Sequence, residues 1–223
     1  MAETKVLFRN ATPADLPEIL RVEESWPEEG RAGADKFISR IDKFGQGFFL
    51  PHFIDPEGKE LIVATISSMP MHYAPERVGE IRSWNQVTND GYLHDAAPSG
   101  WNALYIVSGV IGYQYRGSNI FAPSVLRIVE LAYAMGRRYV LAGAVIPGYR
   151  KFCEKNAETP AFEYCRMRRG NHLVDPLLAM YEAIGFSVPD ARHVIPEYYP
   201  DDASRNYAAI VVRDLEQKPL LNP

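Results

Sequence analysis

Hydrophobic and polar residues follow two different periods along the chain, and the changes of period separate predicted helices from predicted strands. Apolar residues at 6–8 predict a short strand. Thr12, Pro13 and Asp15 then supply an N-cap, a proline in the first turn and an acid, so a helix is expected to begin near residue 13 and to end at Trp26-Pro27. Apolar residues at helical spacing predict a second helix over residues 34–42.

From Gly47 onward the pattern favours strands. Runs rich in aromatic and β-branched residues at 48–54 and 61–69 flank Asp-Pro-Glu-Gly at 55–58, a typical turn sequence, and together predict a hairpin. Further strands are expected at 80–87 and 104–111, with glycine- and proline-containing breaks between them. Aromatic residues between Phe44 and Phe53 fit core packing at least as well as an acceptor pocket.

After Gly117 the period lengthens to that of a helix. One apolar face is expected, formed by Val125, Ile128, Val129, Ala132 and Met135, and the helix should stop at Gly136. A buried strand at 139–145, a partly helical connection over 149–172, a helix over 176–184 closed by Gly185, and strands at 186–194 and 206–212 complete the prediction. Residues 218–223 read as a frayed tail, and without a repeat or linker we expect one domain over residues 1–223.

Composition excludes several classes of protein. With 47% hydrophobic and 23% charged residues the chain should fold unaided, and its net charge of -4 argues against nucleic acid as the main partner. The longest apolar runs fall short of the ~20 residues that span a bilayer, so no membrane association is expected. Cys153 and Cys165 do not resemble a disulfide framework, which favours reduced thiols in the cytoplasm.

A basic cluster at Arg166, Arg168 and Arg169 has two interpretations: a solvated helix face, or a position beside an anionic ligand. The histidines are scattered, so no metal site is predicted. No Gly-x-Ser-x-Gly elbow is present, which argues against a serine hydrolase.

The most informative segment is the strand, loop and helix over residues 104–136. The first backbone N–H groups of a helix have no internal acceptor and carry roughly half a positive charge. A glycine-bearing loop that leads from a strand into a helix therefore predicts an anion site, although many α/β proteins share this outline.

Two stretches sharpen this interpretation. Gln-Tyr-Arg-Gly-Ser-Asn-Ile at 114–120 is similar to the acyl-CoA loop of the Gcn5-related N-acetyltransferase (GNAT) family, and Met-Tyr-Glu-Ala-Ile-Gly-Phe at 180–186 resembles that family's aromatic-Tyr-x-x-x-Gly-Phe segment. The order of predicted elements resembles the family over essentially the whole chain. In the loop, Asn119 and Phe121 stand where glycines are usual, and a side chain at Phe121 would narrow the approach of a phosphate.

A narrower likeness involves residues 84–91, 115–117, 146–149 and 198–202. These are similar to an acetyltransferase-like domain fused ahead of carbon-nitrogen hydrolases in some bacterial proteins. The chain has no room for the Glu-Lys-Cys set of such a hydrolase, so we expect any hydrolase partner to be a separate polypeptide.

The resemblance implies an α/β (α+β) fold with a mixed, mostly antiparallel central sheet flanked by helices. It also implies an acyl-CoA-dependent N-acyltransferase that uses acetyl-CoA as co-substrate and a small-molecule amine as acceptor. Its cofactor-binding residues would be Val110 and Ile111 on the strand and, in the loop, Arg116, Gly117, Ser118, Asn119 and Ile120.

Catalytic roles also follow from the resemblance. Tyr181 would be the general acid that protonates the departing thiolate, or else a tyrosine that only packs its helix on the sheet. The resemblance also allows the amine to lose its proton through water, as in many members of the family. Glu80, at the start of a strand expected to face the cleft, is the candidate base among the side chains, against the alternative of a solvated edge glutamate, while Tyr105 and His94 are weaker candidates.

Two other functions stay open. The additional segment at 150–172 would suit a transferase of longer acyl chains, taken from CoA or from a carrier protein. The altered loop would suit a catalytically silent acyl-CoA-binding module. The acceptor's identity is undetermined, and a homodimer is compatible with the sequence.

Overall fold

The computed structural model describes residues 5–217, and a mixed sheet forms its centre. Within these residues the sheet has eight strands in the order β1-β2-β4-β5-β6-β10-β9, with β3 paired to β2. Its strands are β1 (Leu7–Asn10), β2 (Phe48–Ile54), β3 (Glu60–Ile62), β4 (Ala64–Met71), β5 (Ala103–Ile111), β6 (Tyr139–Val145), β9 (Val194–Ile195) and β10 (Ala208–Asp214).

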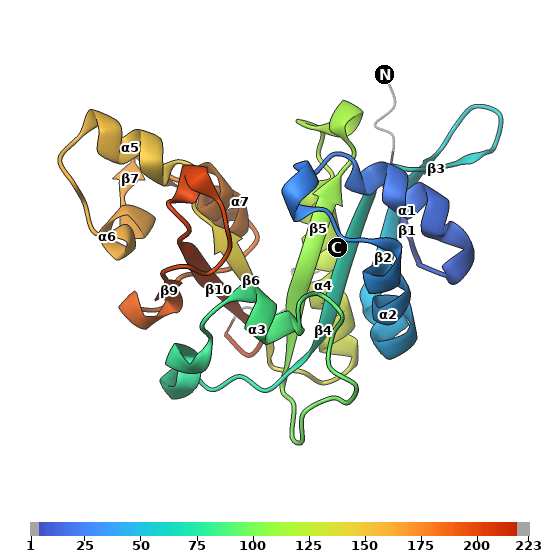
Figure 1. Cartoon of the computed structure of the whole chain (residues 1–223), viewed down its shortest axis with the longest axis horizontal. Helices are drawn as coiled ribbons and strands as arrows, with labels where there is room; N and C mark the ends of the chain where they lie inside the picture. The colour runs from blue at the N-terminus through green and yellow to red at the C-terminus, as the bar shows by residue number, and fades with distance from the viewer. Residues whose placement is uncertain (1–4, 218–223) are drawn as a thin grey trace.

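Helices cover both faces of this sheet (Figure 1). The α-helices are α1 (Leu16–Glu23), α2 (Ala34–Phe44), α3 (Trp84–Thr88), α4 (Phe121–Ala134), α5 (Tyr149–Lys155), α6 (Ala161–Arg166) and α7 (Pro176–Ala183). Short 3-10 helices are η1 (Pro13–Asp15), η2 (Glu28–Gly30), η3 (Gly45–Gly47), η4 (Pro75–Glu80), η5 (Tyr113–Tyr115), η6 (Ala191–His193) and η7 (Asp202–Ser204). A small hairpin pairs β7 (Arg168–Arg169) with β8 (His172–Leu173).

The helices are held by apolar contacts. Helices α1 and α2 lie on the face of the sheet toward the viewer in Figure 1, and α4 lies behind it. The buried apolar residues of α4 are Val125, Ile128, Val129 and Ala132, four of the five residues expected there. Burying each valine or isoleucine contributes about 1.5–3 kcal/mol, which fixes α4 behind β4, β5 and β6.

The parallel pair β5–β6 separates part-way along its length. The two strands pair only from Ala103–Tyr139 to Ile106–Ala142. Beyond this point β5 continues beside β4 as far as Ile111, while β6 stays with β10 as far as Val145. We call the opening between residues 107–111 of β5 and 143–145 of β6 the fork.

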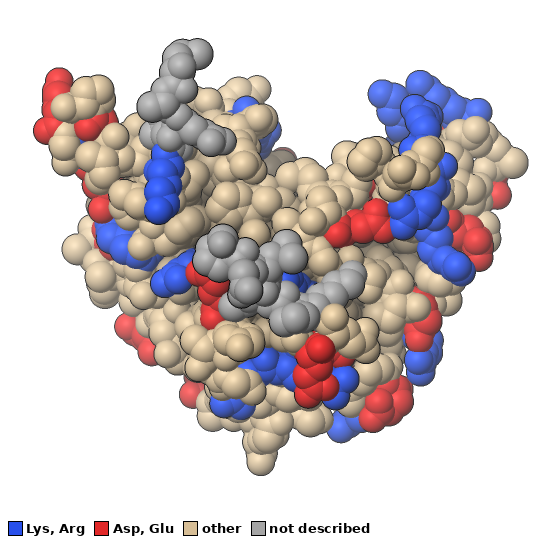
Figure 2. Space-filling model, turned by 180° about the vertical axis from the view of Figure 1, so that it is seen from behind, with Lys and Arg blue, Asp and Glu red and all other residues tan. Residues whose placement is uncertain are grey.

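A β-bulge lies where the fork begins. The β4–β5 register passes from Ser67–Ser108 to Ser68–Ile106, which leaves Val107 as the additional residue. A bulge bends its strand and increases the local twist, so β5 turns away from β6 at this point. In the space-filling view from behind, a V-shaped notch separates two lobes at the top of the molecule (Figure 2).

Most predicted elements are confirmed, including the mostly antiparallel mixed sheet flanked by helices, the strand at 139–145 and the helix closed by Gly185. The predicted hairpin at 48–69 is also present, with its second arm divided into β3 and β4.

The strand predicted at 80–87 is wrong. Ser83 accepts a hydrogen bond from the backbone of Gln86, and Asn89 ends the turn in the left-handed region with φ of 52°, so the segment forms α3. Local capping outweighs the strand preference of its apolar residues. The strand predicted at 186–194 is also largely wrong, because only Ser187 forms a bridge there before η6. The predicted tail at 218–223 lies outside the described residues.

Other structural expectations concern cysteines and the membrane. Cys153 and Cys165 are both free and buried. Between residues 5 and 217, every helix is too short or too polar to cross a bilayer.

Candidate functional site: the fork between β5 and β6

The loop from Gly112 to Ile120 joins β5 to α4 and presents unused backbone donors. Several of its N–H groups donate inside the loop, among them those of Arg116, Ser118 and Ile120. Within the described residues, no acceptor is present for the N–H groups of Gly117, Asn119, Phe121 and Ala122. Gly117 has φ of 82°, and no atom of residues 5–217 lies within 4 Å of the place a Cβ would occupy, so the described structure leaves the loop open there.

Arg116 fastens this loop to the end of α1. Its guanidinium donates to the carbonyl of Ser25 and lies 4.8 Å from the ring centroid of Tyr113. The backbone of Tyr113 in turn donates to Ser25 Oγ at 2.7 Å. The side chain of Arg116 therefore holds the loop in place, and the loop offers an anion its backbone N–H groups.

Tyr181 lies between two phenylalanine rings. Its ring centroid is 5.1 Å from that of Phe121 and 5.3 Å from that of Phe186, and the side chain is 7% exposed. Its hydroxyl makes no hydrogen bond within residues 5–217. Burial, followed by the charge interaction with Tyr105, raises the pKa of Tyr181 far above its usual value. Tyr181 is therefore a neutral hydrogen-bond donor.

A second pair of tyrosines meets at the closed end of the fork. The hydroxyls of Tyr105 and Tyr198 hydrogen-bond each other, and both side chains are buried. A Cβ on residue 143 would collide with the phenol of Tyr198, so this position of β6 requires glycine. Sequence reasoning noticed Tyr198 only as part of a likeness, because nothing in its local pattern indicates contact with a strand 93 positions away.

Trp84 connects α3 to both sides of the fork. Its backbone donates to the carbonyl of Tyr198 at 2.9 Å, and its indole Nε1 donates to the bulged residue Val107 at 2.8 Å. Tyr199 packs edge-on against Trp84 and accepts from Trp26 Nε1 at 3.4 Å. Aromatic side chains from three distant segments thus form one rim of the fork.

Solved structures with the same arrangement identify the fold. The loading GNATL domain of CurA from Lyngbya majuscula superposes with a TM-score of 0.72 at 21% identity, over 96% of this chain and 100% of that one. The GphF GNAT-like decarboxylase in complex with isobutyryl-CoA gives 0.71 at 22% identity, over 94% and 99%. This chain has the GNAT fold.

More distant likeness extends to N-acetyltransferases. The GNAT family N-acetyltransferase YhbS from Escherichia coli, in complex with CoA, has a TM-score of 0.52 at 14% identity, over 96% of this chain and 84% of that one. Among curated proteins, Probable hydrolase YhcX of Bacillus subtilis (strain 168) is 26% identical over 211 residues. The match covers 94% of this chain and 38% of that protein, so the chain spans well under half of its relative. No family model matches the sequence.

Val110 and Ile111 lie on the part of β5 that has left β6. Val110 is buried against α1 and α2, and Ile111 is half-buried. Among residues 5–217, no strand pairs with the β6 side of β5 beyond Ile106. An extended ligand can therefore add to this edge through backbone hydrogen bonds, whatever the side chains are.

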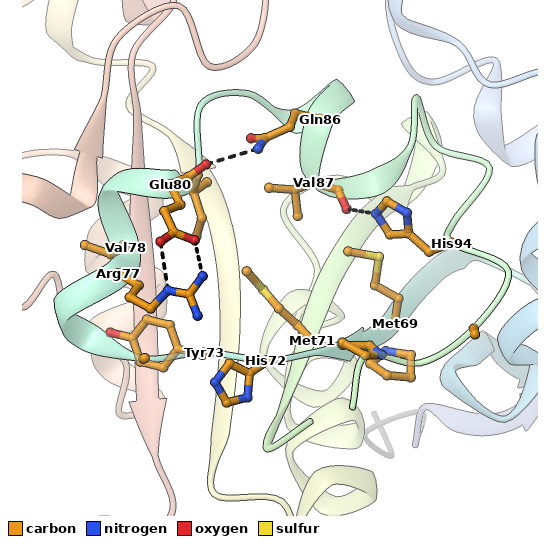
Figure 3. A pocket seen from close by; sticks show the side chains of 15 residues that line it. Met69, Met71, His72, Tyr73, Arg77, Val78, Glu80, Gln86, Val87 and His94 are labelled. Carbon is orange, nitrogen blue, oxygen red and sulfur yellow. Dashed lines mark hydrogen bonds and ion pairs between the residues drawn. The ribbon is translucent and has the colours of Figure 1, made fainter. Parts of the chain in front are cut away.

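Glu80 lies apart from Tyr181 in this GNAT fold. It lines a cavity of about 510 Å³ whose wall includes Met69, Met71, Tyr73 and Val87 but not Tyr181 (Figure 3). Arg77 donates to both carboxylate oxygens of Glu80, at 2.7 and 2.8 Å, and this hydrogen bonding lowers the pKa of Glu80. The structure therefore does not bring the two predicted catalytic residues together.

The two weaker base candidates, His94 and Tyr105, lie in different parts of the molecule. His94 lies in the wall of the same cavity, where Nε2 is 2.9 Å from the carbonyl of Val87. Tyr105 lies in the paired part of β5, at the closed end of the fork, and burial raises its pKa to about 12. A phenol with so high a pKa is a poor base at neutral pH.

A buried arginine that sequence reasoning missed fixes the loop after α3. Arg40 of α2 is 2% exposed and donates to Gly91 O and to Ser108 Oγ, both at 2.9 Å. Burial lowers the pKa of Arg40 to about 10, so the side chain keeps its charge at neutral pH. It ties α2 to β5 beside the bulge.

The basic cluster lies on the lobe that carries α5, α6 and β7. Lys and Arg side chains gather on this lobe, at the right of the notch in Figure 2. Arg168 is paired with Glu182 of α7, and Arg166 stacks on Phe162 at 5.3 Å.

In the described part of the chain, no group of three or more His, Cys, Asp or Glu side chains is placed to hold a metal ion.

Proposed function

We propose that this chain binds an acyl-CoA in the fork and transfers its acyl group, acetyl in the first instance, to a small-molecule amine. The observation that carries the proposal is the separation of β5 from β6 together with four N–H groups, in the loop after β5 and at the start of α4, that have no acceptor within residues 5–217. The pantetheine arm would lie against residues 107–111 of β5. The diphosphate would lie against the N–H groups of Gly117, Asn119, Phe121 and Ala122.

These donors are sufficient for useful affinity. A hydrogen bond to a charged acceptor contributes about 1.5–3 kcal/mol, and the N-terminus of α4 adds its dipole. Three or four such bonds reach the roughly 8 kcal/mol of a micromolar complex. Gly117, Ser118, Asn119 and Ile120 would form the mouth of this site, and Arg116 would hold the mouth against α1.

The reaction needs a proton donor for the departing thiolate, and Tyr181 is suited to this role. An amine with a pKa near 10.4 must lose a proton before it attacks, and a thiolate whose thiol has a pKa near 8.5 must gain one as it leaves. We propose Tyr181 as the donor to the sulfur, because its hydroxyl is protonated and makes no hydrogen bond within residues 5–217, and because its side chain is largely buried. Glu80 would act as base only after leaving Arg77, so water is the preferred route for the amine proton.

A second candidate is decarboxylation of an acyl-CoA whose acyl group carries a carboxylate. It is favoured by the TM-score of 0.71 against a GNAT-like decarboxylase, compared with 0.52 against an N-acetyltransferase. It also needs no general base for an amine. Two further functions are compatible with the same fork. One is transfer of a longer acyl group, taken from CoA or from a carrier protein, and the other is acyl-CoA binding without catalysis.

Calorimetric titration with acetyl-CoA, CoA and a long-chain acyl-CoA tests binding. Binding must then be followed by assays of thiol release with mixed amines and of CO₂ release from malonyl-CoA. Thiol release supports transfer, CO₂ release supports decarboxylation, and binding without either supports the silent module. Tyr181→Phe should lower thiol release about 10²-fold and leave donor affinity nearly unchanged. An unchanged rate would remove Tyr181 from the mechanism.

A further inference from the structure

The hydroxyls of Tyr105 and Tyr198 lie at the point where the fork closes. Tyr105 pairs with Leu141 one position before the β5–β6 register ends. Gly143 is the first residue of β6 beyond that register, and the Tyr198 phenol rests directly on it. An acyl group at the end of a pantetheine arm lying along β5 would reach this same point.

The Tyr105–Tyr198 pair has one hydroxyl proton that their mutual hydrogen bond does not use. Two phenols contribute two hydroxyl protons, and their mutual hydrogen bond uses one. The backbone N–H of Gly143 also acts on Tyr105, where it lowers a pKa that burial raises. Either hydroxyl can be the donor in this pair. When Tyr105 donates to Tyr198, the proton of Tyr198 is left for a third group.

Tyr181 approaches the same point from α7. It interacts electrostatically with both Tyr105 and Tyr198, and its own hydroxyl has no partner within residues 5–217. Tyr198 is 2% exposed and Tyr181 is 7% exposed. Both side chains are therefore largely excluded from water, and the Tyr181 hydroxyl has a hydrogen bond still to make within the described part of the chain.

We propose that Tyr198 and Tyr181 form an oxyanion site for the thioester carbonyl of the acyl donor, with Tyr105 as the residue that positions Tyr198. This inference rests on the proposed function, in which the acyl-CoA occupies the fork. Preorganised donors in a site with little water stabilise a developing oxyanion far better than water does. The hydrogen-bonded chain from Tyr105 through Tyr198 strengthens the terminal donor.

The chemistry at this site balances without a net transfer of phenol protons to the oxygen. When the amine forms its bond to the carbonyl carbon, the π electrons move to oxygen, which accepts hydrogen bonds from Tyr198 and Tyr181. When the carbonyl re-forms, the C–S bond breaks and its electron pair leaves on sulfur. The amine's proton goes to water, and the thiolate takes a proton from the Tyr181 hydroxyl, which water restores.

The carbonyl stretch of a bound thioester gives a test that does not depend on turnover. Acetyl-CoA labelled with ¹³C at the carbonyl should show a shift of this band to lower frequency on binding to the wild-type protein. Tyr198→Phe should remove most of the shift, and Tyr105→Phe part of it. Binding with an unshifted band would overturn the oxyanion site alone, whereas no binding to the wild type would overturn the proposed function as well.

Kinetics supply the second readout. Tyr198→Phe should lower kcat about 10²-fold, the usual effect of losing one oxyanion donor, while Kd for CoA, which has no thioester carbonyl, stays within about threefold. Tyr164→Phe is the matched control, because it removes a buried hydroxyl that bonds Asp175 at 3.1 Å, outside the fork. Equal losses of kcat in the two variants would show that Tyr198 only stabilises the fold, and would overturn its assignment.

Discussion

The ring of Phe121 packs edge-on against the ring of Tyr181, with centroids 5.1 Å apart and planes at 84°. Phe121 is the residue that stands where the GNAT loop usually has a glycine, and its side chain was expected to crowd the phosphate site. It contacts α7 instead. The backbone N–H of Phe121 is without an acceptor in the described residues, so the same residue presents a donor to the diphosphate and a wall to Tyr181.

Phe121→Ala separates these two contributions. Loss of a half-buried ring should reduce the free energy of unfolding by about 2 kcal/mol, below the 3–5 kcal/mol of a fully buried phenylalanine. Tyr181 would lose one of its two ring neighbours, and we expect kcat to fall about tenfold with little change in the Kd of CoA. Phe162→Ala, which removes a half-buried ring beside Arg166, is the control. Markedly tighter CoA binding by Phe121→Ala would instead show that the ring obstructs the phosphate.

Gly117→Val tests the loop. Gly117 has φ of 82°, a conformation that costs a side chain about 1–2 kcal/mol, although no atom of the described residues would obstruct a Cβ. The Kd of acetyl-CoA should rise about tenfold by calorimetry, because the altered backbone moves its N–H groups. Gly100→Val is the matched control. Gly100 has φ of 64° and lies outside the fork, and no atom of the described residues is within 4 Å of its Cβ position. A similar loss of affinity in both variants would exclude a specific role for Gly117.

Glu80→Gln tests the base that sequence reasoning favoured. Glu80 is exposed and held by Arg77, and its lowered pKa makes it a weaker base than a free glutamate. We therefore expect kcat to change by less than about twofold across the neutral pH range. A fall of about 10²-fold, together with loss of the acidic limb of the pH profile, would restore Glu80 as the general base.

Buried phenols predict a loss of stability in alkali. Burial raises the pKa of Tyr73 and of Tyr105 to about 12, and raises that of Tyr198 well above 10. Below pH ~10 the folded and the unfolded chain both keep these phenol protons. Between pH ~10 and ~12 only the unfolded chain loses them, so the free energy of unfolding falls as the pH rises.

The expected slope is about 1.4 kcal/mol per pH unit for each such tyrosine, measured by urea unfolding at several pH values. Tyr105→Phe should flatten the curve, whereas Tyr113→Phe should not, because Tyr113 is 74% exposed. Identical slopes in the wild type and Tyr105→Phe would contradict the burial of this hydroxyl.

Periodicity located the regular elements well. The strand at 139–145 is fully apolar or small and bounded by arginines and a proline, and β6 has the same limits. Helix α4 was recognised from its apolar face and from Gly136, which has φ of 65°. These signals are local, because each depends on residues within one or two turns. Where a local cap competed with strand-like composition, as at Ser83, the prediction was wrong.

The site was less predictable because its parts are distant in sequence. The resemblance pointed to the loop and to Tyr181, but nothing local shows that β6 leaves β5 after Ala142. The Tyr105–Tyr198 contact joins a strand to a loop near the C-terminus, and Arg40 acts on residues 51 and 68 positions away. Gly143 was one signal available in principle, since a glycine inside a buried strand often marks the close approach of another group.

A crystal structure with an unreactive thioether analogue of acetyl-CoA tests the central claim most directly. We expect the pantetheine arm between β5 and β6, hydrogen-bonded to residues 107–111, with the diphosphate at the N–H groups of Gly117 and Asn119. The oxygen that replaces the acyl carbonyl should lie within hydrogen-bonding distance of Tyr198 Oη. An analogue bound elsewhere, with the fork unoccupied or closed, would contradict the account.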